Sequence, residues 1–73
     1  MKVWKIRFDS EAIALDEEYN VRDCTLLNSY VDGDTVYVED GPSAETIMTD
    51  WYGDTAEIVY MDEERAMEMF HPN

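Results

Sequence analysis

Carboxylates are the most abundant side chains in this sequence that could take part in chemistry. The chain has 18 Asp and Glu residues but only one histidine, His71, and one cysteine, Cys24. His71 lies close to the chain end, where fraying should leave it exposed to solvent. Cys24 has no histidine near it in the sequence, and we expect it to be a small buried residue. General acid–base or nucleophilic catalysis is therefore poorly supported, and we predict no catalytic residue and a protein that is not an enzyme.

The carboxylates do not follow a metal-binding pattern. The segment Asp32-Gly33-Asp34 is superficially similar to a calcium loop, but its glycine lies between the two acids and a strand pattern follows at once. Turn formation explains these residues. The clusters Asp16–Glu18 and Asp62–Glu64 could collect divalent cations only loosely. The sequence also lacks a glycine-rich phosphate loop and zinc-ligand spacing, so we predict no metal site and no cofactor.

Charge is the outlying property of the composition. The formal net charge is −13. From residue 8 onward the chain contains all 18 acids but only two Lys or Arg residues, Arg22 and Arg65. A magnitude of about 2–8 is enough to keep a small domain in solution. Such a surface should repel nucleic acid and anionic membranes and attract basic proteins. Halophilic adaptation is a rival cause, but the Met, Ile and Tyr content does not suggest it.

The chain is long enough for one small domain, residues 1–73, with a hydrophobic content of 45%. No segment has the apolar run of a signal peptide or a membrane helix. A single cysteine excludes an intrachain disulfide and fits a reducing compartment. We therefore expect a cytoplasmic protein.

Four segments have the patterns of β-structure. Lys2–Phe8 alternates, with Trp4, Ile6 and Phe8 on one side and Val3, Lys5 and Arg7 on the other. Cys24–Val31 and Thr35–Glu39 flank the Asp32–Asp34 turn and predict a hairpin. Thr55–Met61 predicts a further strand.

Lys2, Lys5 and Arg7 are expected to pair with acids such as Glu57 or Glu39. The outward residues Val3, Tyr37, Val59 and Met61 indicate a dimer or partner surface.

The clearest helix pattern spans Ser43–Gly53. Ala44, Ile47, Met48, Trp51 and Tyr52 have helical spacing, and Trp51 and Tyr52 should cover the sheet. Ser43 can cap the first turn and Gly53 can end the helix. Glu11–Tyr19 also suits a helix, capped by Ser10 and ended by Asn20, with Ala12, Leu15 and Tyr19 on one face. The alternation of Ile13 and Leu15 leaves a short strand as the alternative, and we favour the helix. Asp62–Glu64 would start a final helix with Ala66, Met69 and Phe70.

These elements predict an α+β domain of order β-α-β-β-α-β followed by a C-terminal helix. That order resembles the ferredoxin-like fold, an antiparallel sheet with both helices on one face. If Glu11–Tyr19 is a strand, the alternative is a β-rich antiparallel sheet with one central helix.

In an ordered domain the carboxylates become fixed negative points. We expect Asp32, Asp34, Glu39 and Asp40 to form a rigid anionic ridge around the hairpin end, and Asp62, Glu63 and Glu64 to form a second acidic turn. Such a surface fits a groove lined by lysines and arginines. The expected partner is a basic nucleic-acid-binding protein. Nucleic acid itself and membranes are not expected partners, and the chain would act as a monomer or a homodimer.

In size, charge and lack of catalytic residues, with acidic clusters such as Asp32-Gly33-Asp34 and Asp62-Glu63-Glu64, the chain resembles the small acidic inhibitors of phages and mobile elements. These include anti-CRISPR proteins and DNA mimics. The resemblance implies a stoichiometric inhibitor that occupies the nucleic-acid-binding site of a bacterial defence nuclease, such as a CRISPR effector, in the host cytoplasm. The alternative is an acidic antitoxin or adaptor that binds a basic partner through its apolar sheet face.

Overall fold

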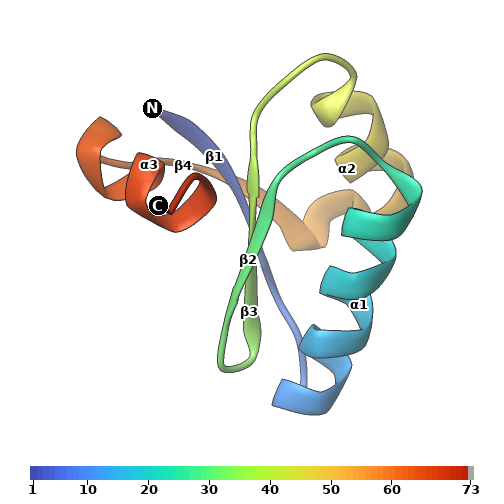
Figure 1. Cartoon of the computed structure of the whole chain (residues 1–73). Coiled ribbons are helices and arrows are strands. Elements are labelled where there is room, and N and C mark those ends of the chain that lie inside the picture. The colour runs from blue at the N-terminus through green and yellow to red at the C-terminus, as the bar shows by residue number, and fades with distance from the viewer. Residues whose placement is uncertain (73) are drawn as a thin grey trace.

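The strand β1 (Lys2–Arg7) lies inside a four-stranded antiparallel sheet, in a computed structural model that describes residues 1–72 (Figure 1). The other strands are β2 (Ser29–Asp32), β3 (Thr35–Glu39) and β4 (Ala56–Tyr60), and the order across the sheet is β2-β3-β1-β4. With helices α1 (Glu11–Cys24) and α2 (Ala44–Tyr52) between strands, this is the predicted ferredoxin-like arrangement. The β-rich alternative is wrong because the segment after β1 is helical.

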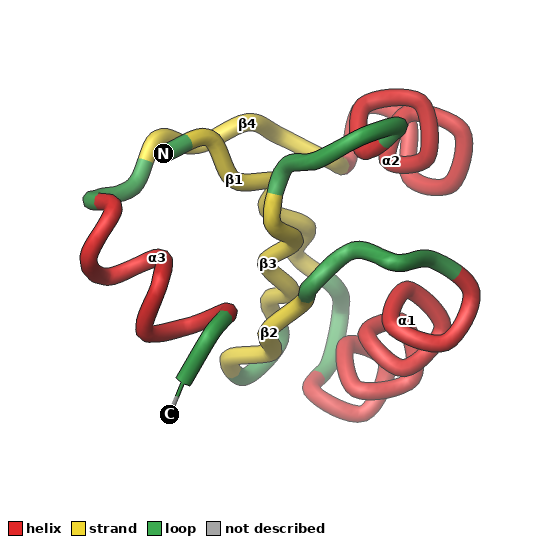
Figure 2. Tube along the Cα trace, turned by 45° about the horizontal axis from the view of Figure 1, so that its top comes forward, coloured by secondary structure: helices red, strands yellow, loops and turns green. Residues whose placement is uncertain are grey.

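The alternation of β1 places side chains in two separate cores. Trp4 and Ile6 are buried on the face covered by α1 and α2. Val3 is buried on the opposite face, where α3 (Glu63–Phe70) supplies Ala66 and Phe70. Figure 2 shows this three-layer arrangement, with α3 on one side of the sheet and α1 and α2 on the other. The predicted orientation of β1 is therefore confirmed.

Helix α1 is longer than predicted and buries a different face. Ser10 caps it as expected, because its Oγ accepts a hydrogen bond of 3.2 Å from the Ile13 amide. The predicted end at Asn20 is wrong, and the helix continues to Cys24. The face in contact with the sheet contains Ala14, Glu18 and Val21, while the predicted face of Ala12, Leu15 and Tyr19 is exposed. A buried glutamate interrupts the apolar stripe, so the spacing of apolar residues alone does not identify this face.

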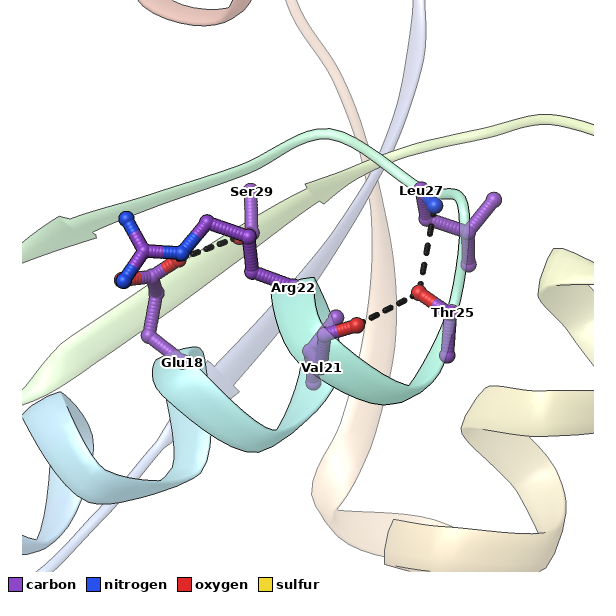
Figure 3. Close-up of polar contacts among 6 residues, drawn as sticks. All are labelled: Glu18, Val21, Arg22, Thr25, Leu27 and Ser29. Carbon is purple, nitrogen blue, oxygen red and sulfur yellow. Dashed lines mark hydrogen bonds and ion pairs between the residues drawn. The ribbon is translucent and has the colours of Figure 1, made fainter.

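Polar contacts explain where α1 ends and how β2 begins (Figure 3). Thr25 Oγ1 donates to the Val21 carbonyl at 2.6 Å and accepts from the Leu27 amide at 3.1 Å. Glu18 accepts a 2.5 Å hydrogen bond from Ser29 Oγ, and this joins α1 to β2. The predicted strand over Cys24–Val31 is therefore wrong in its first half. Cys24 ends the helix with its side chain exposed, and it is not the small buried residue that we expected.

Helix α2 contains the predicted stripe, but the two aromatic residues in it are not fully buried. Ala44 and Met48 are fully buried, whereas Trp51 is 43% exposed, so its expected role of covering the sheet is wrong. Ser43 occupies the N-cap position with φ 67° and makes no side-chain capping bond. Gly53 ends the helix with φ 57°, a region that favours glycine, and a 3-10 turn (Gly53–Thr55) leads into β4.

Helix α3 covers part of the sheet face that was expected to be open. Its residues Ala66 and Phe70 form a core with Val3, against which Tyr37 and Val59 pack. Asp62 caps the helix, because its carboxylate accepts a 3.3 Å hydrogen bond from the Arg65 amide. The apolar residues of this face are therefore packed within the chain.

Replacement of Met48 by alanine should destabilise the domain by about 2–5 kcal/mol, because it empties a fully buried site between α2 and the sheet. Trp51→Ala should cause a smaller loss, since Trp51 is half-exposed. Urea unfolding followed by circular dichroism measures both free energies. An equal or greater loss in Trp51→Ala would contradict this packing.

Tyr52 should make the stability sensitive to alkaline pH. Its Oη donates to Glu17 Oε2 at 3.0 Å, and burial together with that carboxylate raises the pKa of Tyr52. The neutral phenol is favoured in the folded state, so its contribution is present below pH 10 and is lost as the pH rises further. Tyr52→Phe should therefore lose less stability between neutral pH and pH above about 10 than the parent does. Tyr60→Phe, at an exposed position, should follow the parent curve.

Candidate functional site

The structure separates the four predicted acids of the hairpin into two pairs. Asp32 and Asp34 flank the turn between β2 and β3, at the foot of the sheet in Figure 1. Glu39 and Asp40 lie at the other end of β3, about 17 Å away at the rise of about 3.3 Å per residue of a strand. These four residues therefore do not form one continuous ridge. Because β3 and β4 both run antiparallel to β1, Glu39 and Asp40 lie at the same sheet end as Asp62.

Asp34 is held by neighbouring side chains. Thr35 Oγ1 donates to Asp34 Oδ1 at 3.0 Å, and Arg7 Nε lies 3.2 Å from Asp34 Oδ2. The Thr35 hydrogen bond and then the Arg7 guanidinium lower the pKa of Asp34, so its charge is retained in mildly acidic solution. Arg7 pairs with an acid as predicted, but the acid belongs to the turn and is neither Glu57 nor Glu39.

Glu39 is the most enclosed of the predicted site residues, with only 14% of its side chain exposed. His71 Nε2 lies 3.0 and 3.1 Å from its two carboxylate oxygens, and Asn28 Nδ2 donates to Oε1 at 2.8 Å. The imidazole of His71 connects the end of α3 to the sheet. His71 therefore has a defined contact with Glu39, whereas we expected a frayed, solvent-exposed residue. The Glu39 carboxylate is occupied by these contacts.

Asp40 also has an internal partner. The indole Nε1 of Trp4 donates to Asp40 Oδ1 at 3.2 Å, although the aspartate itself remains exposed. Lys2 lies over the same indole, with Nζ 5.4 Å from the ring centroid. The position of Asp40 is thus set by the buried Trp4, and one of its oxygens is already engaged.

The acids of α3 are the most available part of the predicted site. Glu63 and Glu64 are exposed in the first helical turn, where the helix dipole favours negative charge. They line an open depression of about 840 Å³ on the outer side of α3, together with Met67, Glu68, His71 and Pro72. We call the three carboxylates of this depression, Glu63, Glu64 and Glu68, the α3 acidic surface.

A second groove connects this surface to the hairpin. It lies between α3 and the strands β2 and β3, and its lining residues are Tyr30, Asp32, Tyr37, Arg65, Glu68 and Met69. Asp32 and Glu68 therefore share one groove although they are far apart in the sequence. Of the predicted hairpin acids, the structure thus brings Asp32 close to α3 and joins Glu39 to the end of that helix through His71, while Asp34 and Asp40 have partners elsewhere.

Glu68 was not among the predicted site residues, and within α3 its only neighbour of opposite charge is Arg65, three residues earlier in the same groove. It lies in the last turn of α3, where the dipole disfavours an acid, and that turn contains no basic residue. It also lies four residues after Glu64, a spacing that brings two like charges together on a helix. That spacing is visible in the sequence once the helix is placed, and it was the signal that could have identified Glu68.

Glu18 is buried on α1, where Arg22 Nε lies 3.8 Å from its Oε2. Within residues 1–72, no group of three or more His, Cys, Asp or Glu side chains is arranged to hold a metal ion. None of the helices in the same range is both long and apolar enough to cross a membrane.

Comparisons with protein-family models, with curated proteins and with solved structures found no match to this chain.

Replacement of Glu68 by glutamine should raise the stability by about 0.3–1 kcal/mol, because it removes a like-charge neighbour of Glu64 and an unfavourable acid near the helix C-terminus. Urea unfolding at low ionic strength measures the difference. Glu63→Gln, in the favourable first turn, should give no such gain. A loss of stability in Glu68→Gln would show that this acid is needed for folding.

Proposed function

We propose that this protein is a stoichiometric inhibitor that uses its acidic surface to occupy the nucleic-acid-binding site of a basic effector, such as a bacterial defence nuclease. The contact would be made chiefly by the α3 acidic surface, with Asp32 at its edge. Exposed Lys and Arg side chains that normally bind a phosphate backbone would instead meet these fixed carboxylates. The protein would then act by competition and would perform no reaction of its own.

The observation that carries this proposal is the segregation of charge. Between Arg22 and Arg65 the chain contains twelve Asp and Glu residues and no basic residue. Within residues 1–72, only three acids lie within 4.0 Å of a basic side chain, namely Glu18, Asp34 and Glu39. The other acids are not compensated at short range, and self-repulsion of this kind opposes folding without strengthening the core.

The geometry of α3 adds to this support. Glu64 and Glu68 are placed on one side of a helix, where their Cβ atoms are separated by about 6 Å. Both line the depression, so their carboxylates face the same open surface. A rigid pair of charges loses less conformational entropy on binding than charges on a disordered tail would.

The alternative, an acidic antitoxin or adaptor that binds through an apolar sheet face, has less support. Tyr37 and Val59 pack against the Val3, Ala66 and Phe70 core. A partner that used this face would first have to displace α3. We therefore favour the charged surface over the apolar one.

Affinity capture tests the proposal with little disturbance of the site. The single cysteine, Cys24, is exposed on α1, on the other side of the sheet from α3, and it can be coupled to biotin maleimide. Captured proteins from a bacterial lysate should be basic nucleic-acid-binding proteins that elute as salt rises, because screening shortens the range of the attraction. Duplex DNA should displace them, and the free inhibitor should block their DNA binding.

The triple variant Glu63→Gln, Glu64→Gln and Glu68→Gln should weaken the complex by about tenfold or more, if each exposed pair contributes up to about 1 kcal/mol. The matched control is Glu11→Gln, Asp16→Asn and Asp23→Asn, which removes three charges from α1 on the opposite layer. Equal losses in both variants would indicate a general charge effect and not a site. A complex that is insensitive to salt and to DNA would overturn the proposal.

A further inference from the structure

The outer edge of the sheet at β4 has unpaired backbone groups. Met1 and Met61 exchange two hydrogen bonds, since the Met1 amino group donates to the Met61 carbonyl at 2.7 Å and the Met61 amide donates back at 2.9 Å. Hydrogen-bonded and non-hydrogen-bonded pairs alternate along an antiparallel ladder. Val59 and Glu57 are therefore bonded to β1, whereas Ala56, Ile58 and Tyr60 direct their backbone groups away from it.

Most of these outward groups are free to pair. The Ala56 amide donates a hydrogen bond to the Gly53 carbonyl. The groups still free to pair are therefore the Ala56 carbonyl and the amide and carbonyl of both Ile58 and Tyr60. The opposite edge is shorter. There the Glu39 amide donates to the Asn28 carbonyl, so by the same alternation Ser29 and Val31 are the outward residues of β2. The β4 edge is thus the longer of the two open edges.

The side chains of β4 do not protect this edge. Natural edge strands commonly carry lysine, proline or a bulge that prevents pairing with another chain. β4 contains neither lysine nor proline, and its only charged residue is Glu57, which lies opposite Lys5 of β1. Ile58 is 43% exposed and Tyr60 is 79% exposed, on the face shared with Trp4.

We propose that β4 pairs with β4 of a second copy, antiparallel and across a twofold axis at Ile58, to give a continuous eight-stranded sheet. The register is self-complementary. Ile58 meets its own copy, and the large Tyr60 meets the small Ala56 of the partner. The free groups form four hydrogen bonds, two between the Ile58 residues and two from the Tyr60 amides to the partner's Ala56 carbonyls.

The twofold register favours a second copy over an unrelated strand as the occupant. The same three residues supply both halves of the ladder, and no charge on β4 faces the same residue of the copy. The net charge of −13 on each chain opposes association. Added salt should therefore strengthen the dimer, because it screens this repulsion. The complex with a basic effector has the opposite salt dependence, so the two interactions can be separated.

Amide hydrogen exchange of the parent protein tests the proposal directly. In the monomer the Ile58 and Tyr60 amides should exchange rapidly, while those of Glu57 and Val59 are protected by β1. As concentration rises from micromolar to millimolar at high salt, the Ile58 and Tyr60 amides alone among these four should gain protection. Sedimentation equilibrium over the same range should show a dimer.

Ile58→Lys should weaken the association by about tenfold or more, because two lysines would meet at the twofold axis. The matched control is Leu15→Lys on α1, where the parent residue is 48% exposed against 43% for Ile58. Circular dichroism confirms that each variant is folded. A protein that stays monomeric throughout, or a dimer in which the Ile58 and Tyr60 amides still exchange rapidly, would overturn the proposal.

Discussion

The burial of β1 on both of its faces is the constraint on which the rest of the structure depends. Val3 is buried on one face, and Trp4 and Ile6 are buried on the other, so each face needs its own cover. The helices α1 and α2 close one side, and the short helix α3 is needed to close the second. The two cores use both faces of the sheet, so the side chains that remain exposed, apolar as well as acidic, lie on the helix exteriors and at the sheet edges.

Much of the fold could be predicted because strand alternation is a local property. The orientation of Trp4 and Ile6, the hairpin turn at Gly33 and the order of the elements all follow from neighbouring residues. The face of α1 could not be predicted, because a buried Glu18 held by Ser29 interrupts the apolar pattern that identifies a core-facing stripe. Local rules do not contain such long-range compensation.

The candidate site was predictable in composition but not in geometry. The sequence identifies a surplus of acids, but it does not show that His71 contacts Glu39 or that Trp4 contacts Asp40. The first pair is separated by 32 positions in the sequence and the second by 36. Those pairings assign part of the predicted set to structural roles. Glu68, in contrast, lies in the last turn of α3, where the helix dipole disfavours an acid, and its only neighbour of opposite charge on that helix is Arg65.

The acidic surface and the open β4 edge are linked by the chain itself, since Asp62 and α3 follow β4 directly. In an antiparallel β4 pair related by a twofold axis perpendicular to the sheet, both copies of α3 lie on the same face. The twofold axis runs beside β4, whereas Glu68 of α3 shares a groove with Tyr30 and Asp32 of β2, the strand farthest from that axis, so the two α3 acidic surfaces lie on opposite halves of the eight-stranded sheet. This separation limits the repulsion between them and yields one extended anionic face. A dimer of this form could engage two basic sites of one effector at once, and the second contact would then benefit from a high effective concentration.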